Sequence, residues 1–72
     1  MRTFTAYVEF DPETKLYVAT VPGLPGAHTQ AQSLDELQMN LKEVVELCLE
    51  EFEGSPDQLP RFVGIQSVEV AV

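Results

Sequence analysis

The sequence predicts an α+β fold, a single small domain with the order β-β-β-α-β, in which one helix packs on one face of an antiparallel-rich sheet. Three observations carry this prediction: alternating apolar residues near the start, two proline–glycine pairs, and a capped amphipathic stretch in the second half. The 72 residues, 44% of them hydrophobic, suffice for one domain over residues 1–72. A domain of this size is near the lower limit of independent stability, so contact with a partner subunit would help by burying more apolar surface.

Alternation and turn chemistry predict the first two strands. Residues 3–10 alternate as a half-buried strand does, and the side chains expected on its core side are Phe4, Ala6, Val8 and Phe10. The Asp11-Pro12 pair favours a type I turn and hence a hairpin. Residues 15–21 are β-branched and aromatic enough for the second strand. Apolar residues occupy both of its faces, and the set favoured for the core is Tyr17, Ala19 and Val21.

The second strand is expected to end at the segment Pro22–Gly26. Two of its residues lack an amide donor and two are glycines, so it cannot continue a β-ladder and must turn. Residues 27–32 then form a short third strand. At the end of that strand, Ser33 and Glu36 have the spacing of a capping box, which marks a helix start.

An amphipathic helix is predicted from Leu34 to Phe52. Its apolar residues fall on one broad arc at the helical period; they are Leu34, Leu37, Leu41, Val44, Val45, Cys48, Leu49 and Phe52. Gly54, at a plausible C′ position, and Pro56 are expected to stop the helix. Residues 61–72 are predicted to form the last strand, with a bulge between residues 64 and 67 where the apolar parity changes.

Charge and composition limit the classes of partner. Twelve acids against four bases give a net charge of −8, which repels nucleic acids and anionic membranes and favours a basic protein partner. No apolar stretch approaches the roughly 20 residues of a membrane span, and no signal peptide is visible, so a cytoplasmic location is expected. Cys48 is the only cysteine, which excludes an internal disulfide and suits a reducing compartment.

The acidic residues do not predict a catalytic centre. A ribonuclease H-type site needs three or four carboxylates that converge on divalent metal ions. The candidate carboxylates are explained by a turn, a helix start and a loop; they are Asp11, Asp35, Glu36 and Asp57. The chain is therefore expected not to be an enzyme, with no catalytic, metal-binding or cofactor-binding residue.

Other chemistry-bearing residues have structural explanations as well. His28 is the only histidine, and Cys48 lies on the apolar arc of the helix, so neither a zinc cluster nor a Cys–His pair is expected. Pro22 and Pro25 remove amide donors that a phosphate-binding loop would need, and no lysine follows at the required spacing.

The outer face of the predicted helix is the candidate partner-binding site. Its residues combine a row of carboxylates with two apolar side chains inside the polar arc; they are Glu36, Met39, Glu43, Glu46, Leu47 and Glu50. A solvated outer face is one interpretation of this pattern. Docking of a basic partner is the other, favoured by Met39 and Leu47 as anchors and by the acidic rim that surrounds them. A sheet edge, at the third or the last strand, could instead pair with a second copy and give a homo-oligomer.

The spacing of several short motifs resembles the N-terminal module of HicB-like antitoxins over essentially the whole chain. The residues that carry the resemblance are Tyr17-Val18-Ala19, Pro22, Leu24-Pro25-Gly26, Thr29, Ser33, Glu36, Asn40, Lys42 and Glu43. The resemblance implies a degenerate ribonuclease H-like fold without catalysis, which binds and occludes a small basic ribonuclease toxin of the HicA type. Gly23 and Ala31 depart from residues that the family often has in this loop.

Many HicB-like proteins also carry a C-terminal DNA-binding module, which these 72 residues lack, so direct DNA binding is not expected. Three hypotheses remain open at this point. The first is an antitoxin-like inhibitor, the second is an orphan homo-oligomeric scaffold without a toxin partner, and the third is a metal-dependent nuclease.

Overall fold

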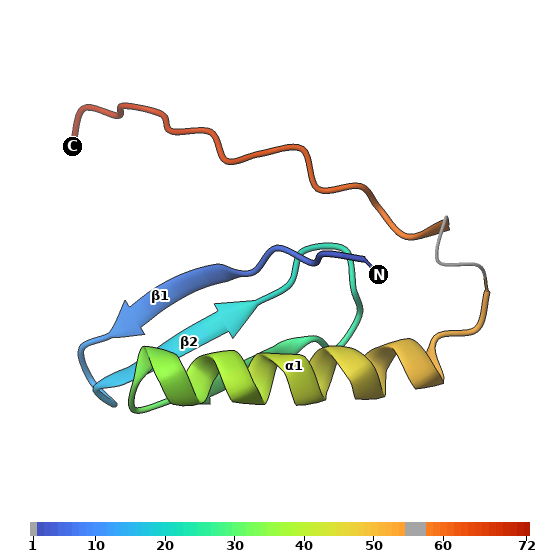
Figure 1. Ribbon diagram of the computed structural model, residues 1–72. Helices are drawn as coiled ribbons and strands as arrows, with labels where there is room; N and C mark the ends of the chain where they lie inside the picture. The colour runs from blue at the N-terminus through green and yellow to red at the C-terminus, as the bar shows by residue number, and fades with distance from the viewer. Residues whose placement is uncertain (1, 55–57) are drawn as a thin grey trace.

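The structure, a computed structural model, describes residues 2–54 and 58–72. Three strands are followed by one helix: β1 (Tyr7–Asp11), β2 (Leu16–Thr20), β3 (His28–Ala31) and α1 (Leu34–Glu51). The strands form one antiparallel sheet in the order β1-β2-β3, and α1 lies across one face of it (Figure 1). The predicted α+β class, with one helix on an antiparallel sheet, is therefore confirmed.

The Asp11 carboxylate organises the turn between β1 and β2. One of its oxygens accepts a hydrogen bond from the Glu13 amide at 3.0 Å, and the other accepts from Thr14 Oγ1 at 2.9 Å. Lys15 completes the reversal in the left-handed region, with φ of 61°. The hairpin pairs Val8 with Ala19, which places both residues on the same face of the sheet. Val8 and Phe10, expected on the core side of the first strand, are nevertheless 43% and 53% exposed, because α1 does not contact β1. Ala19 is fully buried, which confirms the choice of core face for β2.

Two consecutive turns connect β2 to β3. In each, a proline and a glycine occupy the central positions, and the glycines Gly23 and Gly26 have φ of 84° and 79°. The Leu24 amide donates to the Val21 carbonyl, and the Ala27 amide donates to the Leu24 carbonyl. Proline followed by a residue of positive φ is typical of type II turns. The Pro/Gly segment therefore brings Val21 and Ala27 together, and the Val21 amide donates to the Ala27 carbonyl at 2.9 Å.

The helix begins where its cap was predicted. Ser33 has extended backbone angles, and its hydroxyl accepts from the Glu36 amide at 3.1 Å. One core cluster places Leu37 against Ala19 and Ala31, at the centre of the sheet. The other is formed by buried residues of the turns and of the segment after the helix, with the second half of α1 packed on them; its buried members are Val21, Leu24, Ala27 and Leu59.

The strands and the helix are shorter than predicted. β1 begins at Tyr7 rather than at residue 3, and its pairing with β2 ends at the Tyr7–Thr20 pair. The helix ends at Glu51 with Phe52 as its C-cap, so Gly54 lies one residue beyond the C′ position predicted for it. Pro56, the other predicted stop, lies outside the described residues.

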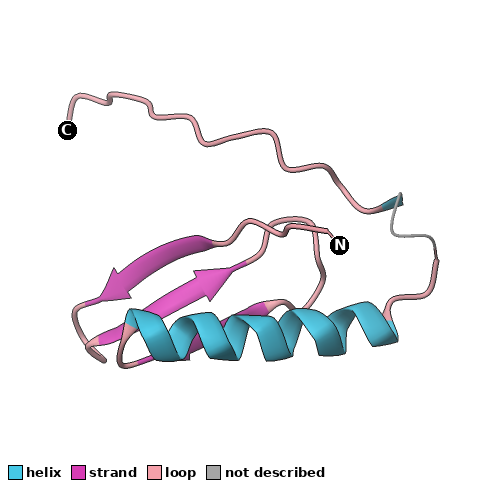
Figure 2. Ribbon diagram, viewed as in Figure 1, coloured by secondary structure: helices cyan, strands magenta, loops and turns pink. Residues whose placement is uncertain are grey.

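The prediction of a strand over residues 61–72 is wrong for the single copy. These residues are extended, but they run apart from the sheet without pairing (Figure 2). Residues 62–72 make no hydrogen bond within the described part of the chain. A strand needs a backbone partner, and the local sequence pattern does not supply one. Residues 63–72 are called the C-terminal arm below.

We expect Gly23→Ala to destabilise the fold by about 1–2 kcal/mol, the cost of a left-handed conformation for a residue with a Cβ. The new Cβ would also lie 3.0 Å from Cβ of Pro60, which is too close for ordinary contact. Urea unfolding monitored by circular dichroism measures the change. Gly64→Ala is the matched control, because nothing lies within 4 Å of its added Cβ. Equal stability of the two variants would contradict the proposed role of the turn.

We expect Ser33→Ala to lower the free energy of unfolding by about 1 kcal/mol, because the Glu36 amide loses its side-chain acceptor at the helix start. Ser67→Ala makes the same chemical change in the exposed arm and is expected to stay within about 0.5 kcal/mol of the parent. Denaturation curves of the three proteins, recorded side by side, test the assignment of the cap. A loss at Ser67 as large as the loss at Ser33 would refute it.

Candidate protein-binding site

The residues predicted to bind a partner lie together on the outer side of α1. At roughly 100° per residue, all six fall within about a third of the helix circumference, opposite the residues that pack on the sheet. We call this surface the acidic stripe; it consists of Glu36, Met39, Glu43, Glu46, Leu47 and Glu50. All six side chains are exposed, Met39 to 67% and Leu47 to 58%. The structure therefore brings the predicted residues together on one surface.

The helix concentrates the negative charge of the chain. It carries six of the twelve acids but only one of the four bases, Lys42. Lys42 lies four residues before Glu46, yet the pair makes no ion pair in the structure, and no other base of the described residues pairs with the stripe. Glu43 lies between Met39 and Leu47, four residues from each, so the two apolar side chains flank a carboxylate. The charge of the stripe is thus uncompensated within the described chain.

The N-terminal end of the stripe is only partly used by the helix cap. Ser33 accepts from the amide of Glu36, as the capping-box spacing predicts. The reciprocal bond, from the Ser33 amide to the Glu36 carboxylate, is absent from the hydrogen bonds of the described chain. The prediction that Glu36 is occupied by the cap therefore holds for its amide alone. Its carboxylate adds to the charge of the stripe.

A second surface, which sequence reasoning missed, is an apolar groove between β1 and α1. The helix packs against β2 and β3 but not against β1. The resulting groove of about 710 Å³ is lined on one side by Phe4, Ala6 and Val8 and on the other mainly by Leu41, Val45, Leu49 and their neighbours on α1. The sequence analysis predicted a last strand without placing it in the sheet, and it predicted no groove beside β1. The sequence signal that could have revealed the groove is the row of apolar side chains at alternate positions of residues 4–10.

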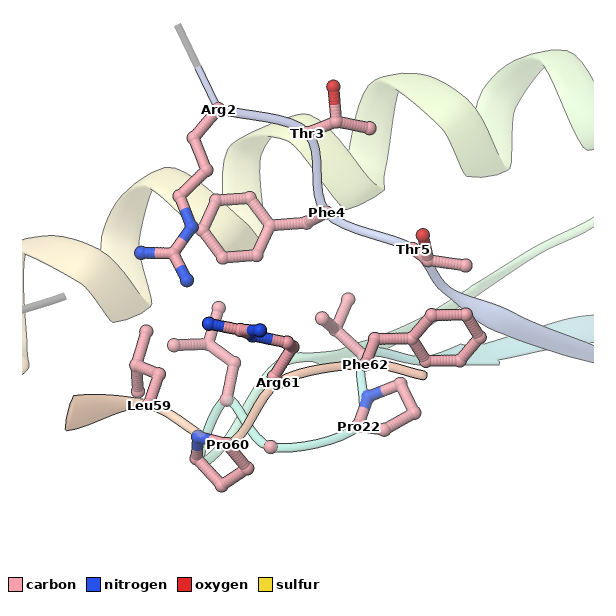
Figure 3. A pocket seen from close by; sticks show the side chains of 12 residues that line it. Arg2, Thr3, Phe4, Thr5, Pro22, Leu59, Pro60, Arg61 and Phe62 are labelled. Carbon is pink, nitrogen blue, oxygen red and sulfur yellow. The ribbon is translucent and has the colours of Figure 1, made fainter. Parts of the chain in front are cut away.

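A smaller recess lies where the N-terminal segment meets the turn and the segment after the helix (Figure 3). Its volume is about 140 Å³, below the roughly 300 Å³ at which small-molecule sites begin. The Arg2 guanidinium lies over the Phe4 ring, 5.4 Å from its centroid, and Arg61 approaches from the opposite side. The recess is best described as the seam that attaches residues 59–62 to the domain.

Residues that could carry chemistry do not converge. Asp11 is held by the β1–β2 turn, His28 is exposed on β3, and Cys48 is half-buried beside the core. In residues 2–54 and 58–72, no group of three histidine, cysteine, aspartate or glutamate residues is arranged to hold a metal ion. Asp57, a fourth carboxylate considered from the sequence, lies outside these ranges.

The described part of the chain contains no helix with the length and apolar character needed to cross a membrane.

Comparison with known proteins places the chain among small proteins of similar length. It is 51% identical over 69 residues to a UPF0150 protein of Thermotoga maritima, an alignment that covers 96% of this chain and 91% of the relative. UPF0150 proteins of Archaeoglobus fulgidus and of Synechocystis sp. are 49% and 42% identical over 67 residues, which is 93% of each chain. No family model and no solved structure matches. The identity over nearly the full length shows that the chain belongs to the UPF0150 family.

Proposed function

We propose that this protein is an antitoxin-like inhibitor, which binds a small basic ribonuclease toxin of the HicA type and occludes its RNA-binding and catalytic surface. The observation that carries the proposal is the acidic stripe, where unpaired carboxylates surround exposed Met39 and Leu47 on the side of α1 that faces away from the sheet. An inhibitor of this kind acts by occupancy. It needs a complementary surface and no catalytic residue.

The composition of the stripe suits a basic partner on physical grounds. Carboxylates at the rim attract a cationic protein from a distance and raise the rate of productive encounters. Apolar side chains at the centre supply affinity, because burying a leucine or methionine side chain contributes about 1.5–3 kcal/mol. The carboxylates of the stripe can pair with the partner, because none of them makes an ion pair with another described residue that would first have to break.

The sequence resemblance to HicB-like antitoxins supports the same class of partner. The motif residues of that resemblance build the Pro/Gly turns and the start of α1, and so position the stripe. With a net charge of −8, the chain is proposed to bind the basic toxin rather than nucleic acid, and to do so in the cytoplasm.

A second candidate function is a homo-oligomeric scaffold without a toxin partner. The exposed groove beside β1 and the unpaired arm favour it, because both are apolar surfaces that a second copy would cover. The two candidates differ in what they require. Inhibition requires a short basic protein, encoded beside this gene or recovered with the tagged chain, whereas a scaffold requires only its own copies.

We expect the combined change Glu43→Lys, Leu47→Asp and Glu50→Lys to weaken binding of the co-purified basic partner by at least about a hundredfold, because an anchor and two attractive charges are lost together. The fold is expected to persist, since all three side chains are exposed. Isothermal titration calorimetry measures the affinity, and circular dichroism checks the fold.

The matched control for this experiment is the pair Glu9→Lys and Glu13→Lys. It makes the same two charge reversals on the β1–β2 hairpin, away from α1, and both residues are exposed. The control raises the net charge by four and the stripe variant by three, so an effect of net charge alone would weaken binding at least as much in the control. An affinity of the stripe variant equal to that of the parent would reject the helix surface as the docking site.

The purified chain is expected to cleave no RNA in the presence of magnesium or manganese, because an inhibitor by occupancy contributes no metal-binding centre. Gel analysis of a labelled RNA incubated with the chain tests this, and the same RNA with the basic partner serves as the positive control. Metal-dependent cleavage that Asp11→Asn or Glu36→Gln abolishes would instead establish a nuclease.

A further inference from the structure

We propose that two copies of this chain exchange their C-terminal arms, so that the arm of each copy adds as a strand to the free edge of β1 in the other and covers the groove there. The proposal concerns self-association. It does not depend on whether a toxin binds the acidic stripe.

The arm has the properties of a strand that lacks its partner. It is extended, and residues 62–72 make no hydrogen bond within the described chain. Its apolar side chains face solvent: Val63 is 92% exposed, Ile65 68%, Val68 83% and Val70 68%. Unpaired backbone amides and exposed β-branched side chains together favour pairing with a sheet edge.

The edge of β1 offers the matching acceptor. β1 pairs with β2 on one side only, and its other side is the end of the sheet. The groove next to this edge has apolar residues on both walls, Val8 and Ala6 on the sheet side and Leu41 and Val45 on the helix side. Polar residues border it on each side; they are Arg2, Thr3, Thr5, Gln38, Lys42 and Glu46. A strand added here would place every second side chain into the groove. The ten residues of the arm span about 33 Å, which is close to the length of residues 2–11 when extended.

The exposed area of the single copy is large enough for a stable dimer interface. The chain exposes 6186 Å², whereas a compact monomer of 8.0 kDa exposes about 4,450 Å². Its radius of gyration is 13.9 Å, against about 11 Å for a compact domain of this length. The excess of about 1,700 Å² per copy exceeds the approximately 800 Å² that each partner buries in a standard interface.

Charge permits association at this surface. The chain as a whole is strongly acidic, but residues 58–72 contain one acid, Glu69, and one base, Arg61. The acidic stripe points away from the sheet, whereas the arm would bind at the edge of the sheet. Two copies can therefore meet along β1 without bringing their stripes face to face.

The course of the arm favours a second copy over its own β1. In the single copy the arm leaves the domain after Phe62 and runs apart from its own sheet (Figure 2). Val63 and Ile65 lie on one side of the arm and Val68, Val70 and Val72 on the other, so the double variant used below changes one residue of each side. The segment just before the arm, residues 59–62, is held against the domain. Leu59 is buried there, and Phe62 lies beside Thr5 and Pro22 (Figure 3).

The test begins with the molar mass of the full-length chain by light scattering, from micromolar to millimolar concentration. The parent is expected to be a dimer. The double variant Ile65→Asp and Val70→Asp is expected to raise the dissociation constant by at least about tenfold per substituted side chain. Leu47→Asp, which removes an exposed apolar residue from the stripe, is the matched control and is expected to remain dimeric.

A cross-linking experiment then identifies the chain that the arm contacts. In a Cys48→Ser background, one protein carries Ala6→Cys and a second carries Val68→Cys, and the two are mixed and treated with a short bis-maleimide. Exchange is expected to give the mixed cross-linked dimer. A third protein carries both cysteines and reports closure within one chain, as a cross-linked monomer.

Each outcome decides the proposal. A dimer that the arm variant dissociates and that yields the mixed cross-link supports it. A monomer at all concentrations, an internal cross-link in the doubly substituted chain, or a dimer that survives the arm variant overturns it. The affinity for a basic partner is measured separately on the stripe variants, so failure here leaves the inhibitor proposal unaffected.

Discussion

The packing of α1 on two of the three strands is the contact from which the other features of the structure follow. Leu37 is 2% exposed and lies against Ala19 and Ala31, whose small side chains leave the helix room to sit close over β2 and β3. Asn40 supports the same side, since its side-chain amide donates to the Gln30 carbonyl of β3 at 3.3 Å. Because the helix is drawn toward β3, its opposite flank does not reach β1. The groove is thus a direct consequence of where the helix is anchored.

This placement separates two surfaces of different chemistry. The outer side of α1 carries carboxylates with two apolar side chains among them, whereas the flank near β1 is mainly apolar. Of the six residues of the stripe, only Glu46 also borders the groove. Charged rims favour association that is fast and sensitive to salt, while buried β-branched side chains favour slow dissociation. The two surfaces therefore suit a reversible partner and a lasting subunit contact, respectively.

Most of the fold could be predicted from interactions between residues close in the sequence. The pairing of residues 61–72 could not, because it depends on residues that are distant in the sequence. The Asp11 turn, the two Pro/Gly turns and the Ser33 cap each depend on residues within a few positions, so the sequence predicted them well. The stripe was predictable for the same reason, because helical spacing alone places its residues together. Residues 61–72 have the composition of a strand, but whether they form one depends on which backbone they meet. The groove was missed because it depends on which strands α1 contacts, and that is a non-local property.

The positions of the groove and the stripe on α1 would allow oligomerisation and partner binding at the same time. A strand added at β1 would lie on the flank of α1, and the residues that it would touch on the helix are Leu41, Val45 and Leu49. The stripe is centred on the far side of the same helix, so its anchors Met39 and Leu47 would stay accessible. Occupation of one surface would then leave the other open, and a two-fold pair of copies would present two stripes. Two linked stripes bind a multivalent partner more tightly than one, with no additional contact in either site.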